Sequence, residues 1–121
     1  MRKHEPLYKS FGYAFQGIWR TIRDERNIKI HLTATVLVVI FGLLLHISET
    51  EWFVCAVFIA LVISLELVNT AVEAAVDLVT EERRPLAKKA KDAAAGAVLA
   101  AAICAAIVGC VIFLPKLVVL L

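Results

Sequence analysis

The sequence has few of the residues that shape disulfide-rich or glycine-rich proteins. Its 121 residues include three cysteines, three prolines and five glycines, and only 8% are aromatic. The cysteines all lie in apolar stretches, and an odd number in such places is typical of small hydrophobic residues rather than of a disulfide or metal-binding set. The chain also has no P-loop, no GxGxxG fingerprint and no kinase-type HRD motif. These absences exclude a disulfide-stapled secreted domain and the usual phosphate-cradling loops.

Aliphatic residues are abundant instead. The chain is 61% hydrophobic with a mean hydropathy of +0.84, whereas soluble domains are about 45–50% apolar. It still carries 13 basic and 11 acidic residues, a net charge of +2, and these are separated from the apolar runs. This combination excludes a disordered chain and a coiled-coil rod. It indicates an all-α integral membrane protein with one domain over residues 1–121.

Four segments have helical patterns. The first has an apolar and a basic face, which suits a helix lying in the membrane interface. The other three are apolar and long enough to cross a hydrocarbon core of about 30 Å at 1.5 Å per residue. The expected amphipathic helix is 7–24, and the expected membrane helices are 30–47, 52–79 and 93–114.

Two prolines and the basic residues set the expected ends and orientation of these helices. Pro85 should break the charged connection 80–92, and Pro115 should end the last helix. Seven basic residues precede the first span, none lies in the 46–51 turn, five lie in 80–92, and one follows the last span. Because cytoplasmic loops are rich in Lys and Arg, the N-terminus and 80–92 are expected in the cytoplasm and the C-terminus outside.

The second expected membrane helix carries a polar stripe on one face. Glu66, Asn69, Glu73 and Asp77 follow one another at steps of three and four residues. A carboxylate in the bilayer core costs roughly 2.5–3.5 kcal/mol on insertion scales, so such residues usually mark a functional site. Glu66 is expected to lie deepest, with the other acids closer to the cytoplasm.

Several interpretations of this stripe remain open at the level of the residues. Glu73 and Asp77 could be an ordinary solvated helix end, and the stripe could line an ion path in a non-enzymatic ion-coupled membrane protein. A purely structural membrane subunit would leave the cost of Glu66 unexplained. The stripe could also serve phosphoryl transfer, which needs carboxylates for Mg²⁺ and cations for phosphates. Glu25, before the first span, and Lys91 and Asp92, before the third, could complete such a site.

The residues also resemble a known family. The Glu66-x-x-Asn69-x-x-x-Glu73-x-x-x-Asp77 run, followed by Lys91 and Asp92, is similar to the signature of the small prokaryotic diacylglycerol kinases. The resemblance covers nearly the whole chain. It implies three transmembrane helices after an amphipathic helix, a homotrimer with shared active sites, a location in the bacterial inner membrane, and phosphorylation of a lipid hydroxyl by ATP with Mg²⁺. It gives no role to nucleic acid.

The resemblance also implies roles for individual residues. Glu66 would be the general base that contacts the lipid hydroxyl, and Glu25 and Glu73 would hold the metal. Asn69 and Asp77 would support the site. His31 is expected to be an interfacial residue at a helix end without a catalytic role. The residues expected to contact ATP are Tyr13, Glu25, Glu73, Glu82, Arg83, Arg84, Lys91 and Asp92.

The lipid substrate is predicted from one short segment. The Glu25-Arg26-Asn27 stretch, with His31 four residues later, resembles the Gram-positive branch of the family, whose members phosphorylate undecaprenol. Undecaprenol is therefore the expected substrate, and diacylglycerol, which would give phosphatidic acid, is the alternative.

Overall fold

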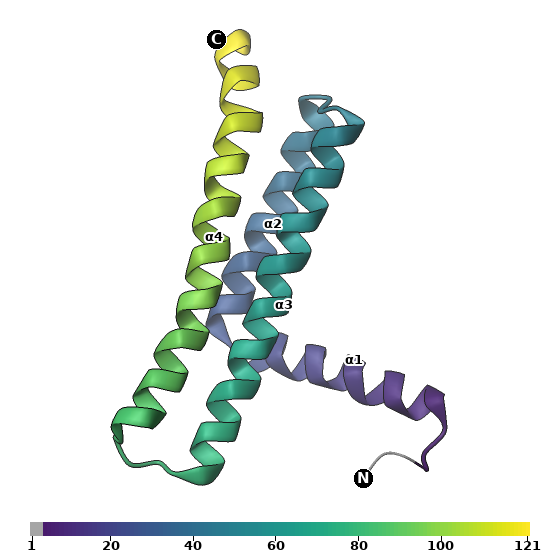
Figure 1. Cartoon of the computed structure of the whole chain (residues 1–121). Coiled ribbons are helices and arrows are strands. Elements are labelled where there is room, and N and C mark those ends of the chain that lie inside the picture. The colour runs from purple at the N-terminus through teal and green to yellow at the C-terminus, as the bar shows by residue number, and fades with distance from the viewer. Residues whose placement is uncertain (1–3) are drawn as a thin grey trace.

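The computed structural model describes residues 4–121, and this part of the chain folds into helices only (Figure 1). Arg2 and Lys3, two of the basic residues used above to orient the chain, lie outside the described residues. The last three helices are long and apolar enough to cross a membrane, which confirms the expected fold class. The helices are α1 (Leu7–Asp24), α2 (Arg26–Leu44), α3 (Glu49–Val79) and α4 (Pro85–Leu120).

The helices form an open arrangement around α3, which contacts each of the other three. Helices α2 and α3 run antiparallel side by side, α4 packs against α3, and α1 projects sideways (Figure 1). The α2–α3 turn lies at one end, the turn end. The 80–84 connection lies at the opposite end, the loop end, and α1 joins α2 on that side.

A single extended residue, Glu25, makes the corner between α1 and α2. Its φ of −103° and ψ of 129° break the helix, while its N–H still donates to the carbonyl of Thr21 at 2.9 Å. Glu25 is also the N-cap residue of α2, where a carboxylate is favoured by the helix dipole. Ile28, three residues after the corner, is fully buried. Helix α2 therefore begins four residues before the expected start at residue 30.

The turn between α2 and α3 ends one helix and caps the next. His46 adopts a φ of 53°, the left-handed conformation that often ends helices, and the N–H of Ile47 donates back to the carbonyl of Gly42 at 3.2 Å. Ser48 then caps α3 by a reciprocal pair of hydrogen bonds with Glu51. These two motifs end α2 at Leu44 and start α3 at Glu49, each three residues before the expected boundary.

Trp52 packs directly over Gly42, where no side chain fits without a shift. A Cβ added at Gly42 would lie 2.5 Å from Cη2 of Trp52, whereas one added at Gly109 would meet nothing within 4 Å. We therefore expect Gly42→Ala to destabilise the protein by about 1–3 kcal/mol, the usual cost of overpacking. Gly109→Ala is the matched control in a membrane helix. Equal unfolding midpoints for the two variants in detergent would contradict this packing.

Helix α4 is longer at both ends than the sequence predicts, so the expected span 93–114 and its proline boundary are corrected. Pro85 occupies the first turn, where its missing N–H costs nothing, and the helix therefore includes most of the expected 80–92 connection. Pro115 lies inside the helix, which continues to Leu120. Lys116 holds this region to α3, because its Nζ donates to Oε2 of Glu51 at 2.8 Å and to the carbonyl of Ile112 at 3.4 Å.

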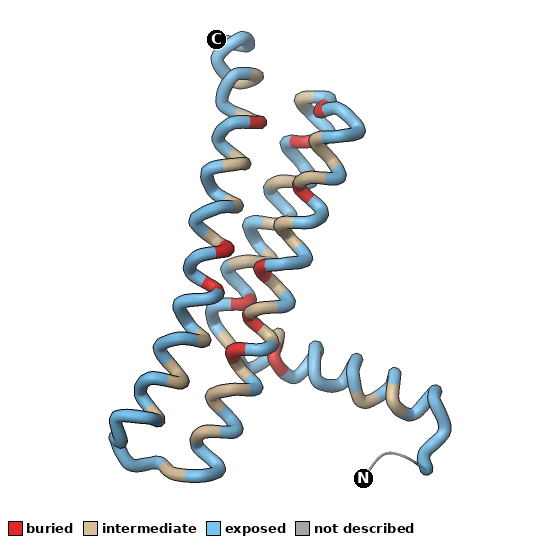
Figure 2. Tube along the Cα trace, in the orientation of Figure 1, coloured by how far each residue is buried: buried red, intermediate tan, exposed pale blue. Residues whose placement is uncertain are grey.

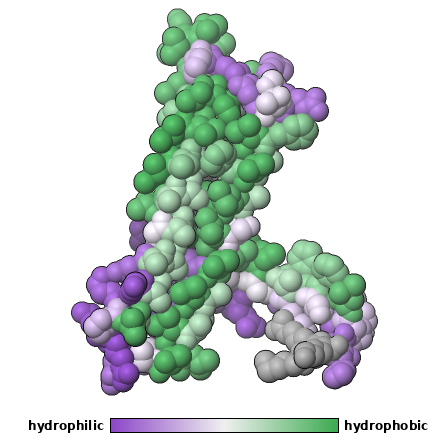
Figure 3. All heavy atoms as spheres, viewed as in Figure 1, coloured by the Kyte–Doolittle hydropathy of each residue, from purple (hydrophilic) through white to green (hydrophobic). Residues whose placement is uncertain are grey.

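Burial and polarity follow the pattern of a membrane protein. Few residues are buried, and they lie along the faces where helices meet (Figure 2). Hydrophobic side chains cover the middle of the bundle, and hydrophilic ones gather at the turn end and at the loop end (Figure 3). The unburied apolar surface on α2, α3 and α4 therefore suits contact with lipid or with further protein.

Candidate active site

The polar stripe on α3 runs from a buried region toward the loop end. Glu66 is 3% exposed and Asn69 8%, whereas Glu73 is half-buried and Asp77 is exposed. Glu66 lies about 26 Å along the helix from Glu49, close to the far boundary of a hydrocarbon core of about 30 Å. The stripe therefore combines one carboxylate sheltered from water with others that water and ions can reach.

Glu66 has ionisable neighbours from two other parts of the chain. Nε2 of His31, on α2, lies 3.9 Å from Oε1 of Glu66. Glu25, at the α1–α2 corner, and Glu73, two turns along α3, lie close enough to act electrostatically on Glu66. Three carboxylates and one imidazole are thus gathered near the loop end. The expectation that His31 is only an interfacial residue misses its position beside Glu66.

Asn69 adds a polar group that is not fully satisfied. Its Nδ2 donates to Oε1 of Glu73 at 3.5 Å, while its buried Oδ1 has no hydrogen-bond partner. An unpaired buried acceptor costs about 1–3 kcal/mol, so such an atom marks a place where another group can complete the site. Asn69 and Glu73 together offer oxygen atoms of the kind that Mg²⁺ prefers.

The carboxylates fit a metal that shares its ligands with phosphate. Among residues 4–121, no group of three or more His, Cys, Asp or Glu is placed to enclose a metal by itself. Mg²⁺ does not require such a group, since it is usually held by one or two carboxylates together with substrate phosphates and water. Glu25 and Glu73 are two carboxylates of the kind that such a smaller set of ligands would need.

The corner also holds an acid that is already engaged. Nε of Arg23 donates to Oδ1 of Asp24 at 2.8 Å, and this hydrogen bond lowers the pKa of the Asp24 carboxyl below its usual value. Asp24 is half exposed and lies beside Glu25 in the sequence. Substitution of Asp24 can therefore serve as a control for substitution of Glu25, because Asp24 is adjacent in sequence and lies outside the stripe.

The first turns of α4 bring cations toward the stripe. Nζ of Lys91 lies 2.6 Å from Oδ1 of Asp77, which ties α4 to α3, and Lys91 also lies within electrostatic reach of Glu73. Lys88 pairs with Asp92 one turn apart on α4. Of the two α4 residues in the expected site, Lys91 faces the stripe and Asp92 is held by Lys88.

A hollow of about 610 Å³ at the loop end gathers most of the other residues expected to contact ATP. Its volume is within the range of small-molecule sites, about 300–1,000 Å³. Arg84 pairs with Glu82 at 3.2 Å on its rim. Tyr13, half-buried in the middle of α1, is not among the described residues that line it. The expected ATP contacts that do line it are Glu82, Arg83, Arg84, Lys91 and Asp92.

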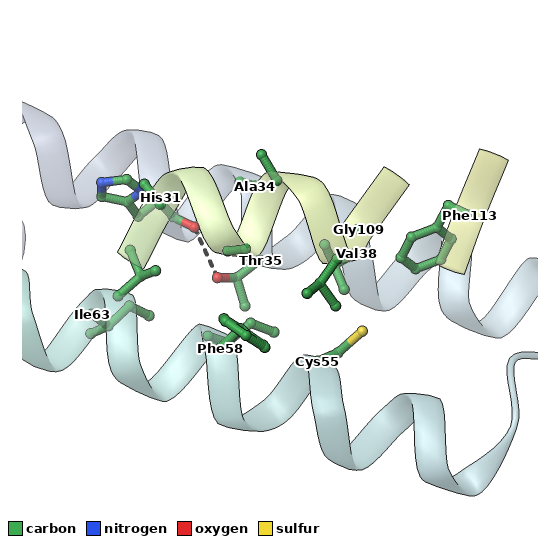
Figure 4. A pocket seen from close by; sticks show the side chains of 15 residues that line it. His31, Ala34, Thr35, Val38, Cys55, Phe58, Ile63, Gly109 and Phe113 are labelled. Carbon is green, nitrogen blue, oxygen red and sulfur yellow. Dashed lines mark hydrogen bonds between the residues drawn. The ribbon is translucent and has the colours of Figure 1, made fainter. Parts of the chain in front are cut away.

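A second cavity, of about 270 Å³, lies in the apolar region between α2, α3 and α4. His31 lies at one end of it and Phe113 at the other, with Val38, Cys55 and Phe58 between them (Figure 4). The hydroxyl of Thr35 donates to the carbonyl of His31 at 2.8 Å, so it does not present a free polar group to the cavity. The cavity is therefore an apolar space, and its His31 end lies close to Glu66.

Comparison with known proteins identifies the family. The profile described as prokaryotic diacylglycerol kinase matches residues 12–113, which is most of the chain. The chain belongs to this family. The kinase is 51% identical to an undecaprenol kinase of Bacillus subtilis over 92% of this chain and 90% of that one. It is 46% identical to a diacylglycerol kinase of Synechocystis over 92% of this chain and 64% of the relative. A diacylglycerol kinase of Pseudomonas aeruginosa is 33% identical over 71% and 70%.

These similarities establish the class of activity. The protein is a membrane lipid kinase, and ATP is the phosphoryl donor that kinase activity implies. A non-enzymatic ion-coupled protein and a purely structural subunit are thereby disfavoured.

Proposed function

We propose that this lipid kinase phosphorylates undecaprenol to undecaprenyl phosphate. The observation that carries the proposal is the buried carboxylate of Glu66, which lies near the membrane boundary between a polar cluster and an apolar cavity. A lipid alcohol matches this position, because its hydroxyl would lie at the interface beside the polar cluster and its hydrocarbon chain would lie in the membrane beside the apolar cavity. The 51% identity to an undecaprenol kinase supports the choice of lipid.

In this proposal Glu66 is the general base. An oxygen of its carboxylate takes the proton of the lipid hydroxyl as the oxygen of that hydroxyl forms a bond to the γ-phosphorus of ATP. The bond between that phosphorus and the β–γ bridging oxygen breaks, and ADP leaves with the electron pair. Burial keeps water from Glu66 and thus from competing with the lipid as the phosphoryl acceptor.

Glu25 and Glu73 are the proposed Mg²⁺ ligands, and Asn69 and Asp77 hold the site in place. When bound, Mg²⁺ neutralises charge on the phosphates. Asn69 fixes the Glu73 carboxylate by their hydrogen bond, and Asp77 orients Lys91 toward the phosphates. The remaining proposed contacts to the nucleotide come from the loop-end hollow and from α1, through Tyr13, Glu82, Arg83, Arg84 and Asp92.

We also propose a homotrimer in the bacterial inner membrane, with its N-terminus and active sites in the cytoplasm. The loop end carries five basic residues in 80–92, as cytoplasmic segments usually do. The wide unburied apolar surface of the membrane helices and the unpaired oxygen of Asn69 support completion of each site by a neighbouring copy.

Diacylglycerol is the second candidate substrate, because two of the relatives above are diacylglycerol kinases. The test is phosphate transfer from γ-labelled ATP in mixed micelles that contain equal amounts of undecaprenol and diacylglycerol. We expect most of the label in undecaprenyl phosphate. Predominant labelling of phosphatidic acid would overturn the choice of lipid and retain the lipid kinase, whereas labelling of neither lipid would contradict the proposed chemistry.

A further inference from the structure

We propose that His31 is a positioning residue for Glu66, whose imidazole donates a hydrogen bond to one carboxylate oxygen so that the other oxygen is presented to the lipid hydroxyl. This inference rests on the proposed role of Glu66 as the base. His31 lies on α2, whereas the acidic stripe lies on α3. No helical spacing in the sequence links His31 to Glu66.

The geometry around Glu66 carries the proposal. Nε2 of His31 faces Oε1 of Glu66 at 3.9 Å, so an approach of about 1 Å would form a hydrogen bond of normal length. Contacts of this kind in ligand-free enzymes often tighten only when substrate is bound. A hydrogen bond to a carboxylate is also among the stronger ones available in a protein.

The surroundings of His31 leave Glu66 as its matching partner. The imidazole is 23% exposed, while the Glu66 side chain is 4% exposed. His31 also lines the apolar cavity, and no other residue described as lining that cavity carries a side-chain nitrogen. The facing residues of α4, such as Ala102 and Ala105, are apolar, so α4 brings no competing charge to this end of the cavity.

A base must present a particular oxygen to the proton that it removes. A carboxylate with no fixed hydrogen bond can rotate and divide its time between orientations, and a misplacement of about 1 Å can cost about 100-fold in rate. Orientation of a catalytic base by a second group is a recurring arrangement in enzymes. His31 supplies that group from α2, and its own backbone carbonyl is fixed by Thr35.

The kinetic test compares three single variants with the wild type: His31→Leu, His31→Gln and Thr33→Val. His31→Leu removes the donor in an apolar setting, and we expect kcat to fall about 10- to 100-fold with the KM for ATP unchanged. His31→Gln restores a donor and should recover most of the lost kcat. Thr33→Val is the matched control and should behave as wild type. Thr33 is an exposed residue of the same helix that does not line the cavity, and its hydroxyl donates to the carbonyl of Lys29.

A second test does not depend on activity. In protein labelled with ¹⁵N-histidine in micelles, Glu66→Gln should move the imidazole resonances of His31 and leave those of His46, at the turn end, in place. Unmoved His31 resonances, an unchanged kcat in His31→Leu, or a His31→Gln variant as slow as His31→Leu would each overturn the proposal. A wild-type protein that phosphorylates no lipid would instead overturn the proposed function on which it rests.

Discussion

Replacing Glu66 by glutamine is expected to lower kcat for lipid phosphorylation by about 10²–10⁴-fold, the usual contribution of a general base. Glutamine keeps the size of the side chain and cannot accept the proton of the hydroxyl. The KM for ATP should change little, because Glu66 is more deeply buried than the carboxylates proposed to bind the nucleotide and its metal. Steady-state kinetics with lipid in mixed micelles measures both quantities.

The control for this variant is Glu49→Gln. Glu49 is an exposed acid in the first turn of the same helix, at the opposite end from the stripe. It should keep the wild-type kcat, and both variants should elute as folded protein in detergent. A folded Glu66→Gln protein with near wild-type turnover would show that Glu66 is not the base.

Replacing Glu73 by glutamine is the second large expected effect. Loss of one of two proposed ligands should raise the Mg²⁺ concentration for half-maximal activity by about tenfold or more, and kcat should fall as well. Glu25→Gln should have the same effect from the other side of the site. The measurement is a Mg²⁺ titration of activity, together with Mn²⁺ binding followed by electron paramagnetic resonance, which detects the metal without turnover.

Asp24→Asn provides the comparison for the metal-site variants. Asp24 precedes Glu25 directly but is engaged by Arg23, so its loss should leave the Mg²⁺ titration unchanged. If Glu73→Gln, Glu25→Gln and Asp24→Asn had the same Mg²⁺ requirement as wild type, the two glutamates would not be ligands.

The sequence predicts the class of fold well because lipid imposes strong patterns. The two-faced pattern of residues 7–24 matches the bounds of α1, and the three apolar runs correspond to the membrane helices. The helix ends were harder to predict. Glu25 and His46 act through backbone conformation, which hydropathy does not encode, and Pro115 interrupts one backbone hydrogen bond without ending α4.

The site was predictable along one helix and much less so between helices. Glu66, Asn69, Glu73 and Asp77 share a face of α3 because their spacing follows the helical repeat. The contact of His31 with Glu66 depends on how α2 packs against α3, and the Lys91–Asp77 pair depends on where α4 begins. Such pairings require the relative positions of two helices, which no local pattern in a single sequence supplies.

The most direct test of the central claim is a time course by ³¹P nuclear magnetic resonance of purified wild-type protein and Glu66→Gln with ATP, Mg²⁺ and undecaprenol in micelles. We expect a lipid phosphomonoester signal to grow in step with ADP in the wild type, with almost none in the variant. Formation of ADP and free phosphate without lipid phosphate, or equal lipid phosphate from both proteins, would contradict the assignment of Glu66 as the base of a lipid kinase.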